Sequence, residues 1–278
     1  MGFNFPPPPL HAVVPATAQT AADIAWGALA LISLAAILWS CRRTRSPLPL
    51  IVLIGGAIAY LNEPIVDTLG LVWHPRIHQE RVINTFGPLP LWGLFCYLVF
   101  FGAATYLFLE VMRRGVSRRA FWAGTAALMV VNLGIEIPLL PTHLYYYYGY
   151  HTPPMTVAHL PLYWLFLNVG GPLLAAVVLL AGERFFTGPR MLLAALVPMT
   201  SYAAYSLAAG WPIFTALHAT RLAQGFVWAA AGLTIAISAL MLDQMALFLD
   251  GRLRTSALQP AASPAPRSVA VPAAAISR

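Results

Sequence analysis

The sequence contains no lysine and few charged residues of any kind. All 16 basic residues among its 278 are arginine, and charged residues make up 9% of the chain against 59% apolar residues. A soluble domain carries roughly 25% charged residues, so this composition excludes a water-soluble enzyme. Without lysine the chain forms no Schiff base, which excludes a retinal-binding rhodopsin. The net charge of +7 comes from arginines at the ends of apolar runs, which indicates a membrane surface and not nucleic acid.

Cysteine and familiar catalytic motifs are also scarce. Cys41 ends one long apolar run and Cys96 lies inside another, at a different depth. A disulfide needs Cα atoms within roughly 7 Å of each other, so no disulfide is predicted. The chain has no glycine-rich phosphate loop, no GxSxG turn and no HExxH helix. The sequence therefore predicts neither a bound metal nor another cofactor.

Seven apolar runs are long enough to cross about 30 Å of hydrocarbon. They lie at residues 22–41, 48–67, 88–110, 120–140, 160–181, 190–210 and 221–249. The sequence therefore predicts an all-α, polytopic membrane protein with seven transmembrane helices.

The arginines predict how these helices are oriented. Thirteen of them follow the first, third, fifth and seventh runs, whereas only Arg76, Arg81 and Arg221 lie on the other side. Arginine-rich loops stay in the cytoplasm. We therefore expect the N-terminus outside and the C-terminus inside, in a multi-pass protein of the cell membrane.

Both tails differ in composition from the apolar runs. Residues 1–20 hold four successive prolines and no basic residue, whereas a signal peptide needs a positive start, so the first run is interpreted as a retained helix. The alanine- and proline-rich residues 255–278 resemble disordered chain. The predicted domains are an extracytoplasmic tail (1–20), a seven-helix membrane domain (21–254) and a disordered cytoplasmic tail (255–278).

Acidic residues in apolar runs are the main candidates for chemistry, because a carboxylate in hydrocarbon is energetically unfavourable and usually functional. Glu63 and Asp67 lie four apart and share a helix face if the intervening proline starts a new turn. Glu136 follows Asn132 by one turn, within hydrogen-bonding reach. We predict that Glu63, Glu136 and Asp67 are catalytic. The alternative is that either glutamate is a structural partner of an outer arginine such as Arg221.

A short repeat predicts that two of these acids converge. LPLWGLF begins at Leu89, 26 residues after Glu63, and LPLYWLF begins at Leu160, 24 residues after Glu136. The second and third spans and the fourth and fifth spans thus resemble two copies of one helix–loop–helix unit. Both copies run in the same direction, so a pseudo-twofold axis along the membrane normal would bring the two glutamates together.

Histidines and aromatic residues gather on the predicted outer side, where all seven histidines fall. We interpret them as the lining of an outward-opening cavity; the alternative is an aromatic belt at the membrane interface. A metal between His74 and His78 would require a helix, which the intervening proline opposes. The residues predicted to bind substrate are Asn62, Trp92, Asn132, His143, Tyr147, Tyr148, His151, Trp164, Asn168, Tyr202 and Arg221.

Three stretches resemble a known family. They are Asn62-Glu63-Pro64 with Asp67, Phe86-Gly87 with Leu89-Pro90-Leu91-Trp92, and Tyr147-Tyr148-Gly149 followed by Pro153-Pro154, Leu160-Pro161-Leu162-Tyr163-Trp164 and Asn168. Over about residues 55–170 the chain resembles the spirocyclase AveC-like family of actinobacterial membrane proteins. The resemblance implies a membrane fold and acid-assisted ring closure of the kind that forms a spiroketal in polyketide secondary metabolism.

Together these features predict a membrane-embedded acid–base cyclase or dehydratase. Its predicted substrate is a lipophilic polyketide- or terpenoid-like molecule, and its predicted partners are that substrate and the lipid bilayer, with no nucleic acid. Two carboxyl groups in different surroundings divide the roles of acid and base. The alternative is a non-catalytic lipid-binding protein or small-molecule transporter that uses the same cavity. The oligomeric state is not predicted.

Overall fold

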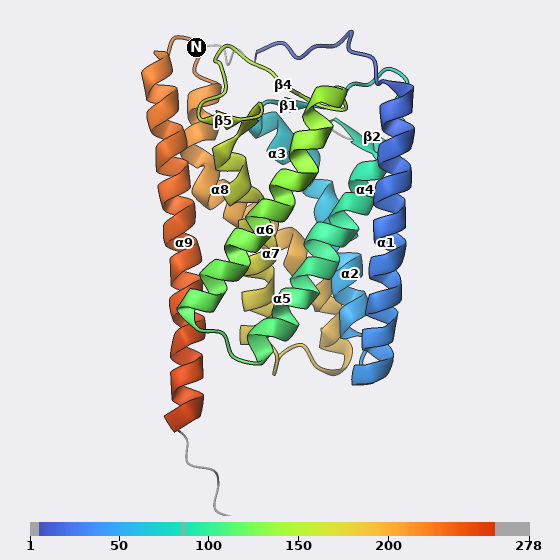
Figure 1. Ribbon diagram of the computed structural model, residues 1–278, viewed down its shortest axis with the longest axis vertical. Coiled ribbons are helices and arrows are strands. Elements are labelled where there is room, and N and C mark those ends of the chain that lie inside the picture. The colour runs from blue at the N-terminus through green and yellow to red at the C-terminus, as the bar shows by residue number, and fades with distance from the viewer. Residues whose placement is uncertain (1–5, 85–86, 259–278) are drawn as a thin grey trace, which may run out of the picture.

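The computed structural model describes residues 6–84 and 87–258, which form a bundle of helices (Figure 1). Within these residues, seven helical segments are long and apolar enough to cross a membrane, as the sequence predicted. They are α1 (Ala16–Thr44); α2 (Leu48–Ala59) continued by η1 (Tyr60–Asn62) and α3 (Glu63–Gly70); α4 (Leu91–Tyr97) continued by η2 (Leu98–Ala103) and α5 (Ala104–Arg113); α6 (Arg118–Leu139) with η3 (Leu140–Thr142); α7 (Leu162–Ala181); η4 (Gly188–Ala195) with α8 (Leu196–Leu217); and α9 (Gln224–Leu258).

Several helices extend beyond the predicted runs. α1 begins at Ala16, inside the predicted tail, and α9 continues through residues 255–258. The rest of the predicted disordered tail, 259–278, lies outside the described residues. α8 continues to Leu217, and Pro212 lies inside this helix without ending it. The third span begins only at Leu91, because the residues just before it form a strand.

The second span changes its helical form next to the first candidate acid. A 3₁₀ turn, Tyr60–Asn62, separates α2 from α3, and Pro64 lies in the first turn of α3. Proline is favoured there because the first N–H groups of a helix have no partner within it. Pro64 therefore starts a new helical turn, which was the condition for Glu63 and Asp67 to share a face.

The second and third spans approach each other closely near their middle. The third span contains a π-helical segment, η2, which packs against α2. A Cβ atom at Gly56 would lie 2.5 Å from the nitrogen and 2.7 Å from the Cα of Gly102. Only glycine permits this approach of two backbones.

Six short strands lie at the upper end of the bundle in Figure 1, which we call the strand-bearing end. β1 pairs with β4, β2 with β3, and β5 with β6, each pair antiparallel. The first pair joins two loops that are distant in sequence, with Val72 opposite Tyr147. The strands are β1 (Val72–Trp73), β2 (Arg81–Asn84), β3 (Pro88–Pro90), β4 (Tyr146–Tyr147), β5 (Thr156–Val157) and β6 (Leu160–Pro161).

Burial is greatest at the centre of the bundle. In α7, 72% of the most apolar 18-residue window is buried, against 17% in α1 and in α6. The exposed side chains of α1 are large and apolar, as Ile24, Leu31 and Trp39 illustrate. Such a helix surface fits the hydrocarbon of a bilayer.

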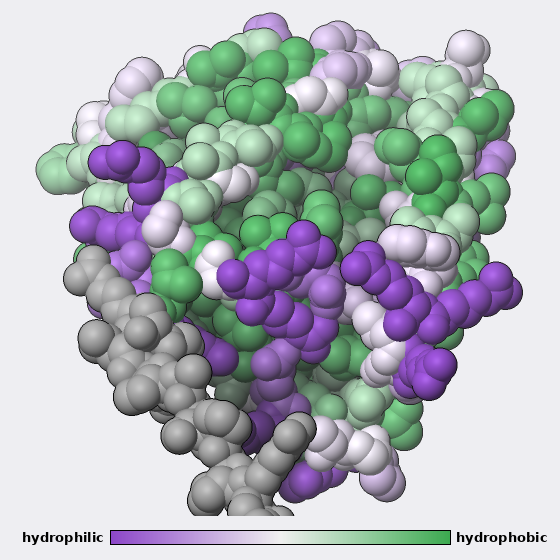
Figure 2. Space-filling view, turned by 60° about the horizontal axis from the view of Figure 1, so that its bottom comes forward, coloured by the Kyte–Doolittle hydropathy of each residue, from purple (hydrophilic) through white to green (hydrophobic). Residues whose placement is uncertain are grey.

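The end opposite the strands is polar. Figure 2 shows hydrophilic residues gathered there around an apolar body. Arg113 forms ion pairs with Glu110 and Glu183, and Arg118 binds Asp243 at 2.8 Å. These ion pairs lie outside the apolar part of the bundle.

Candidate functional site

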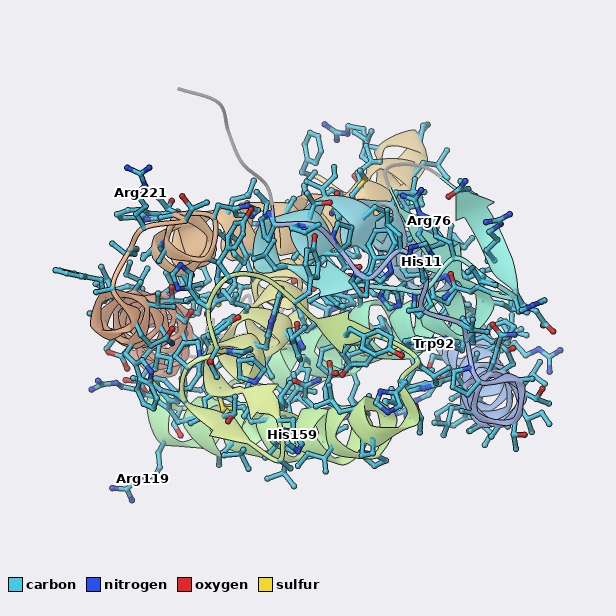
Figure 3. The ribbon with its side chains drawn as sticks, turned by 90° about the horizontal axis from the view of Figure 1, so that it is seen from above. His11, Arg76, Trp92, Arg119, His159 and Arg221 are labelled. Atoms are coloured by element: carbon cyan, nitrogen blue, oxygen red, sulfur yellow. The ribbon has the colours of Figure 1, made fainter. Side chains whose placement is uncertain are left out.

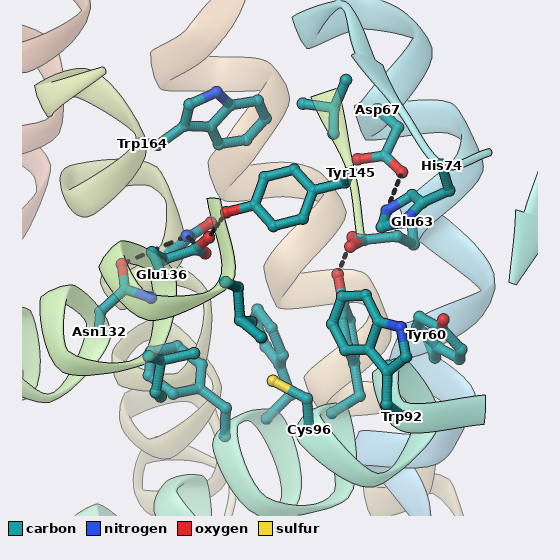
Figure 4. A pocket seen from close by; sticks show the side chains of 18 of the residues that line it. Tyr60, Glu63, Asp67, His74, Trp92, Cys96, Asn132, Glu136, Tyr145 and Trp164 are labelled. Carbon is teal, nitrogen blue, oxygen red and sulfur yellow. Dashed lines mark hydrogen bonds and ion pairs between the residues drawn. The ribbon is translucent and has the colours of Figure 1, made fainter. Parts of the chain in front are cut away.

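One cavity opens in the strand-bearing half of the bundle (Figure 4). About 770 Å³ of space lies between its lining atoms, counting the opening to the outside. Residues from η1, α3, α4, η2, α6, α7 and α8 and from two loops line it. Nine of the twenty lining residues are aromatic, and three carboxyl groups and one imidazole lie among them.

Glu63 lies on one wall of this cavity, at the first position of α3. The phenol of Tyr97 donates a hydrogen bond to Glu63 Oε2, and the Tyr202 hydroxyl lies 3.5 Å from the same oxygen. Tyr97 is held by stacking on Phe101, with ring centroids 4.5 Å apart. An aromatic layer therefore positions the carboxyl group.

Asp67 and His74 lie beside Glu63 on the same wall. Asp67 is one turn further along α3, and its Oδ2 lies 3.3 Å from His74 Nε2. His74 is 6% exposed and follows β1 directly, so the pairing of β1 with β4 fixes its backbone. Burial lowers the pKa of His74 below its usual value of 6.5, which favours the neutral imidazole.

Glu136 lies on the opposite wall, on α6. Tyr145 donates a hydrogen bond to its Oε2. Asn168 of α7 donates to Glu136 Oε1 at 3.2 Å and to Asn132 Oδ1 at 3.3 Å. Asn132 therefore joins the same network, in which an amide and a phenol orient the carboxyl group.

The two walls face each other across the cavity. Figure 4 shows Tyr145 between Glu136 on one side and the Glu63, Asp67 and His74 group on the other. Burial raises the pKa of Tyr145 well above 10.0, so its hydroxyl remains a hydrogen-bond donor. The three carboxyl groups singled out from the sequence thus line one cavity, from two separate helices.

Six of the predicted substrate-binding residues line the cavity together with these acids. Burial also raises the pKa of Tyr147 well above 10.0, so that residue offers a neutral hydroxyl. The six residues are Trp92, Asn132, Tyr147, Trp164, Asn168 and Tyr202.

Asn62 and Tyr148 do not line the cavity, contrary to the sequence-based prediction. Asn62 precedes Glu63 directly, and its Nδ2 donates to the carbonyl of Met199 at 2.8 Å, so it fastens the 3₁₀ turn to α8. The Tyr148 ring packs edge-on against Trp73, at 6.5 Å between centroids. Successive tyrosines of one loop point in different directions, which explains why Tyr147 lines the cavity and Tyr148 does not.

His143 and His151 also lie outside the cavity. His143 is exposed and stacks on Tyr146, with centroids 5.3 Å apart. The Nε2 atom of His151 lies 2.8 Å from the carbonyl oxygen of Ala219, so this histidine connects its loop to the segment between α8 and α9. Both side chains support the loops instead of lining the cavity.

The position of Arg221 differs from the predicted position beside Glu63 or Glu136. It is exposed, and Figure 3 shows it at the rim of the bundle, pointing outward and far from Trp92. The short connection between α8 and α9 carries it to the outside of the bundle. Arg221 therefore does not neutralise Glu63 or Glu136, and phenols and an amide take that position.

The sequence analysis missed the groups that contact the acids most directly. Tyr97, Tyr145 and His74 line the cavity, as do Tyr60 and Cys96. Trp92 and Cys96 are one helical turn apart, so their spacing predicts that they share a helix face. In the structure both line the cavity. Cys41 and Cys96 are both free thiols. Nothing in the local sequence distinguished Tyr145 from its neighbouring tyrosines.

No protein-family model, curated protein or solved structure matches this chain. The resemblance to the spirocyclase AveC-like family therefore stays a prediction. The site itself combines carboxyl groups that accept or donate protons, phenols that orient them, and a largely apolar lining. Such a site suits proton transfer to and from a lipophilic molecule.

Proposed function

We propose that this protein is a membrane-embedded cyclase or dehydratase that acts by acid–base chemistry on a lipophilic polyketide- or terpenoid-like substrate. The observation that carries the proposal is the position of Glu63 and Glu136 on opposite walls of one aromatic cavity. The resemblance to the spirocyclase AveC-like family supports the same reaction class.

In this mechanism a dihydroxyketone closes to a spiroketal with loss of one water. A hydroxyl oxygen bonds to the carbonyl carbon, and its proton passes by way of one carboxylate to the carbonyl oxygen, which forms a hemiketal and leaves that carboxylate unchanged. The resulting hemiketal hydroxyl takes a proton from the opposite carboxylic acid and leaves as water. The second hydroxyl then closes the second ring and transfers its proton back to the acid's conjugate base. General acid–base assistance contributes about 10²–10⁴-fold, and the aromatic walls contribute the remainder by positioning the chain.

The two carboxyl groups have the different surroundings that such a division of roles needs. Glu136 accepts hydrogen bonds from Tyr145 and Asn168. Glu63 accepts one from Tyr97 and lies in the same group as Asp67 and His74. Either glutamate can start as the acid, and Asp67 is the next candidate.

We further propose that the cavity opens on the extracytoplasmic side, with the N-terminus outside and the C-terminus inside. The arginine distribution supports this orientation, because 11 of the 14 arginines among the described residues lie at the end opposite the strands. A substrate would then reach the site from the outer leaflet.

The duplication of the second and third spans in the fourth and fifth is also a proposal. Both Leu-Pro-Leu segments supply a short strand and then begin a helix: β3 leads into α4 at Leu91, and β6 leads into α7 at Leu162. Glu63 and Glu136 occupy corresponding places before them. This similarity supports two copies of one unit.

The test is turnover of a synthetic long-chain dihydroxyketone by the full-length protein in detergent or liposomes. Glu63→Gln and Glu136→Gln should each abolish the mass loss of one water and the preference for one stereoisomer. Glu80→Gln is the matched control, since Glu80 is exposed at the same end, and it should behave like the parent protein. Full activity in both cavity variants would refute the proposal, provided that all proteins unfold at similar temperatures.

A further inference from the structure

Three potential ligands converge on one wall of the cavity. Glu63, Asp67 and His74 each offer one oxygen or nitrogen atom, and these atoms all lie within 4.8 Å of one another. Asp67 Oδ2 and His74 Nε2 are 3.3 Å apart. Two ligands at about 2.0–2.1 Å from a Zn²⁺ ion have this separation when they subtend a roughly tetrahedral angle.

The charge of the cavity also favours a cation. Its lining contains three carboxyl groups and one imidazole, and no arginine among the described residues. Carboxylates removed from water need a partner of opposite charge or a proton. A phenol and an amide donate to Glu136 and a phenol donates to Glu63, whereas Asp67 pairs only with His74 among the described side chains. A divalent cation would neutralise Glu63 and Asp67 and use the histidine as its third ligand.

An independent observation comes from Trp92, which lines the same cavity and is 6% exposed. Its Nε1 is buried and has no hydrogen-bond partner among the described residues. The indole ring lies 5.7 Å from the His74 ring. A buried donor normally has an acceptor, so this N–H indicates that an oxygen atom of a ligand belongs in the cavity near His74.

We propose that Glu63, Asp67 and His74 bind a divalent transition-metal cation of the Zn²⁺ type, with an open position toward the cavity. Carboxylate and imidazole ligands suit this ion, and catalytic zinc sites use three protein ligands. The inference deepens the proposed cyclase, on which its chemical role rests. There Glu63 would serve as a ligand in place of its acid–base role, the cation would polarise the substrate carbonyl, and Glu136 would carry the proton transfers.

Binding is measured on the full-length protein in detergent, after removal of metals with a chelator and dialysis against Zn²⁺. Elemental analysis should find about one zinc per chain. Asp67→Asn and His74→Ala should weaken zinc binding at least about 100-fold, because each removes a direct ligand. His78→Ala is the matched control, since His78 is exposed four residues further along, and it should retain the zinc. Glu136→Gln should retain it as well.

Cobalt binding by the unmodified protein gives a readout that does not depend on how the variants fold. Co²⁺ in the same site should show the visible absorption of a low-coordinate nitrogen–oxygen site. A spectrum equal to that of aqueous Co²⁺, zinc below about a tenth of an equivalent, or equal zinc binding in Asp67→Asn and the parent protein would overturn the metal site. An active, zinc-free protein would overturn this inference alone, whereas zinc binding without turnover would count only against the proposed function.

Discussion

The phenol of Tyr145 donates a hydrogen bond to Glu136, nine residues before it in the chain. The Tyr145 ring also lies 5.8 Å from the ring of His74, which belongs to the opposite wall of the cavity. One side chain from a loop thus contacts both acid-bearing walls. Its position makes it the most informative residue to alter after the carboxyl groups themselves.

Tyr145→Phe should lower turnover and leave the fold intact. The ring still fills its place, but Glu136 loses a hydrogen bond of the charge-assisted kind, which contributes about 1.5–3 kcal/mol, or roughly 10–150-fold in rate. Kinetics on the dihydroxyketone substrate measure the effect. Tyr146→Phe is the control, because Tyr146 stacks on His143 outside the cavity. Equal loss in both variants would show that the Tyr145 hydroxyl has no specific role.

Gly70→Ala should destabilise the protein and distort the cavity wall. A Cβ atom at Gly70 would overlap the ring of Trp164, a buried residue that lines the cavity. Overpacking of this kind costs about 1–3 kcal/mol. Gly134→Ala is the matched control, since nothing lies within 4 Å of its added carbon. Thermal unfolding in detergent should show a lower midpoint only for Gly70→Ala; equal midpoints would contradict the packing described here.

Arg221→Ala should leave both stability and turnover unchanged. The side chain is exposed at the rim and distant from the cavity, and such surface substitutions change the free energy of unfolding by less than about 0.5 kcal/mol. The measurement is the same assay, with Asn168→Ala beside it. Asn168 orients Glu136 and should be impaired. A large loss of activity in Arg221→Ala would restore the counter-ion role predicted from the sequence.

A flux assay separates the proposed enzyme from the transporter alternative. Proteoliposomes loaded with a labelled lipophilic dihydroxyketone should convert it to a product lighter by one water, without net movement of label across the bilayer that exceeds protein-free liposomes. We expect no transport because the bundle is closely packed next to the cavity. The rings of Phe100, Phe101 and Tyr202 line the cavity, and α2 packs directly against the third span at Gly56. Protein-dependent flux without a change in mass would favour the transporter.

Hydropathy made the seven spans predictable, because the membrane requires long apolar runs regardless of tertiary contacts. The same logic found Glu63, Asp67 and Glu136, since carboxyl groups are conspicuous in such runs. Pro64 carried a local signal too, because proline is favoured in a first helical turn. Each of these features depends only on residues nearby in the sequence, so a short segment of the chain is enough to predict it.

The contacts between loops could not be predicted from the local sequence. The sequence predicts that His151 and Arg221 lie on the outer side of the membrane. Their distance from the carboxyl groups depends on the position of the α8–α9 connection, which the sequence does not predict. Tyr97 has no unusual neighbours in sequence, and it contacts Glu63 only because the third span packs beside the second. His74 was compared with His78 on the assumption of a helix. A strand and a turn form there instead, which bring His74 to Asp67.

Val72 and Tyr147 face each other in the strand pair that links the two loops above the acids. Tyr147 and Val72 are also both part of the cavity lining. The shape of this part of the cavity is consequently a joint property of segments 75 residues apart in the chain. A redesign of this cavity for a larger substrate should substitute residues in both segments together, because each strand constrains the position of the strand that it pairs with.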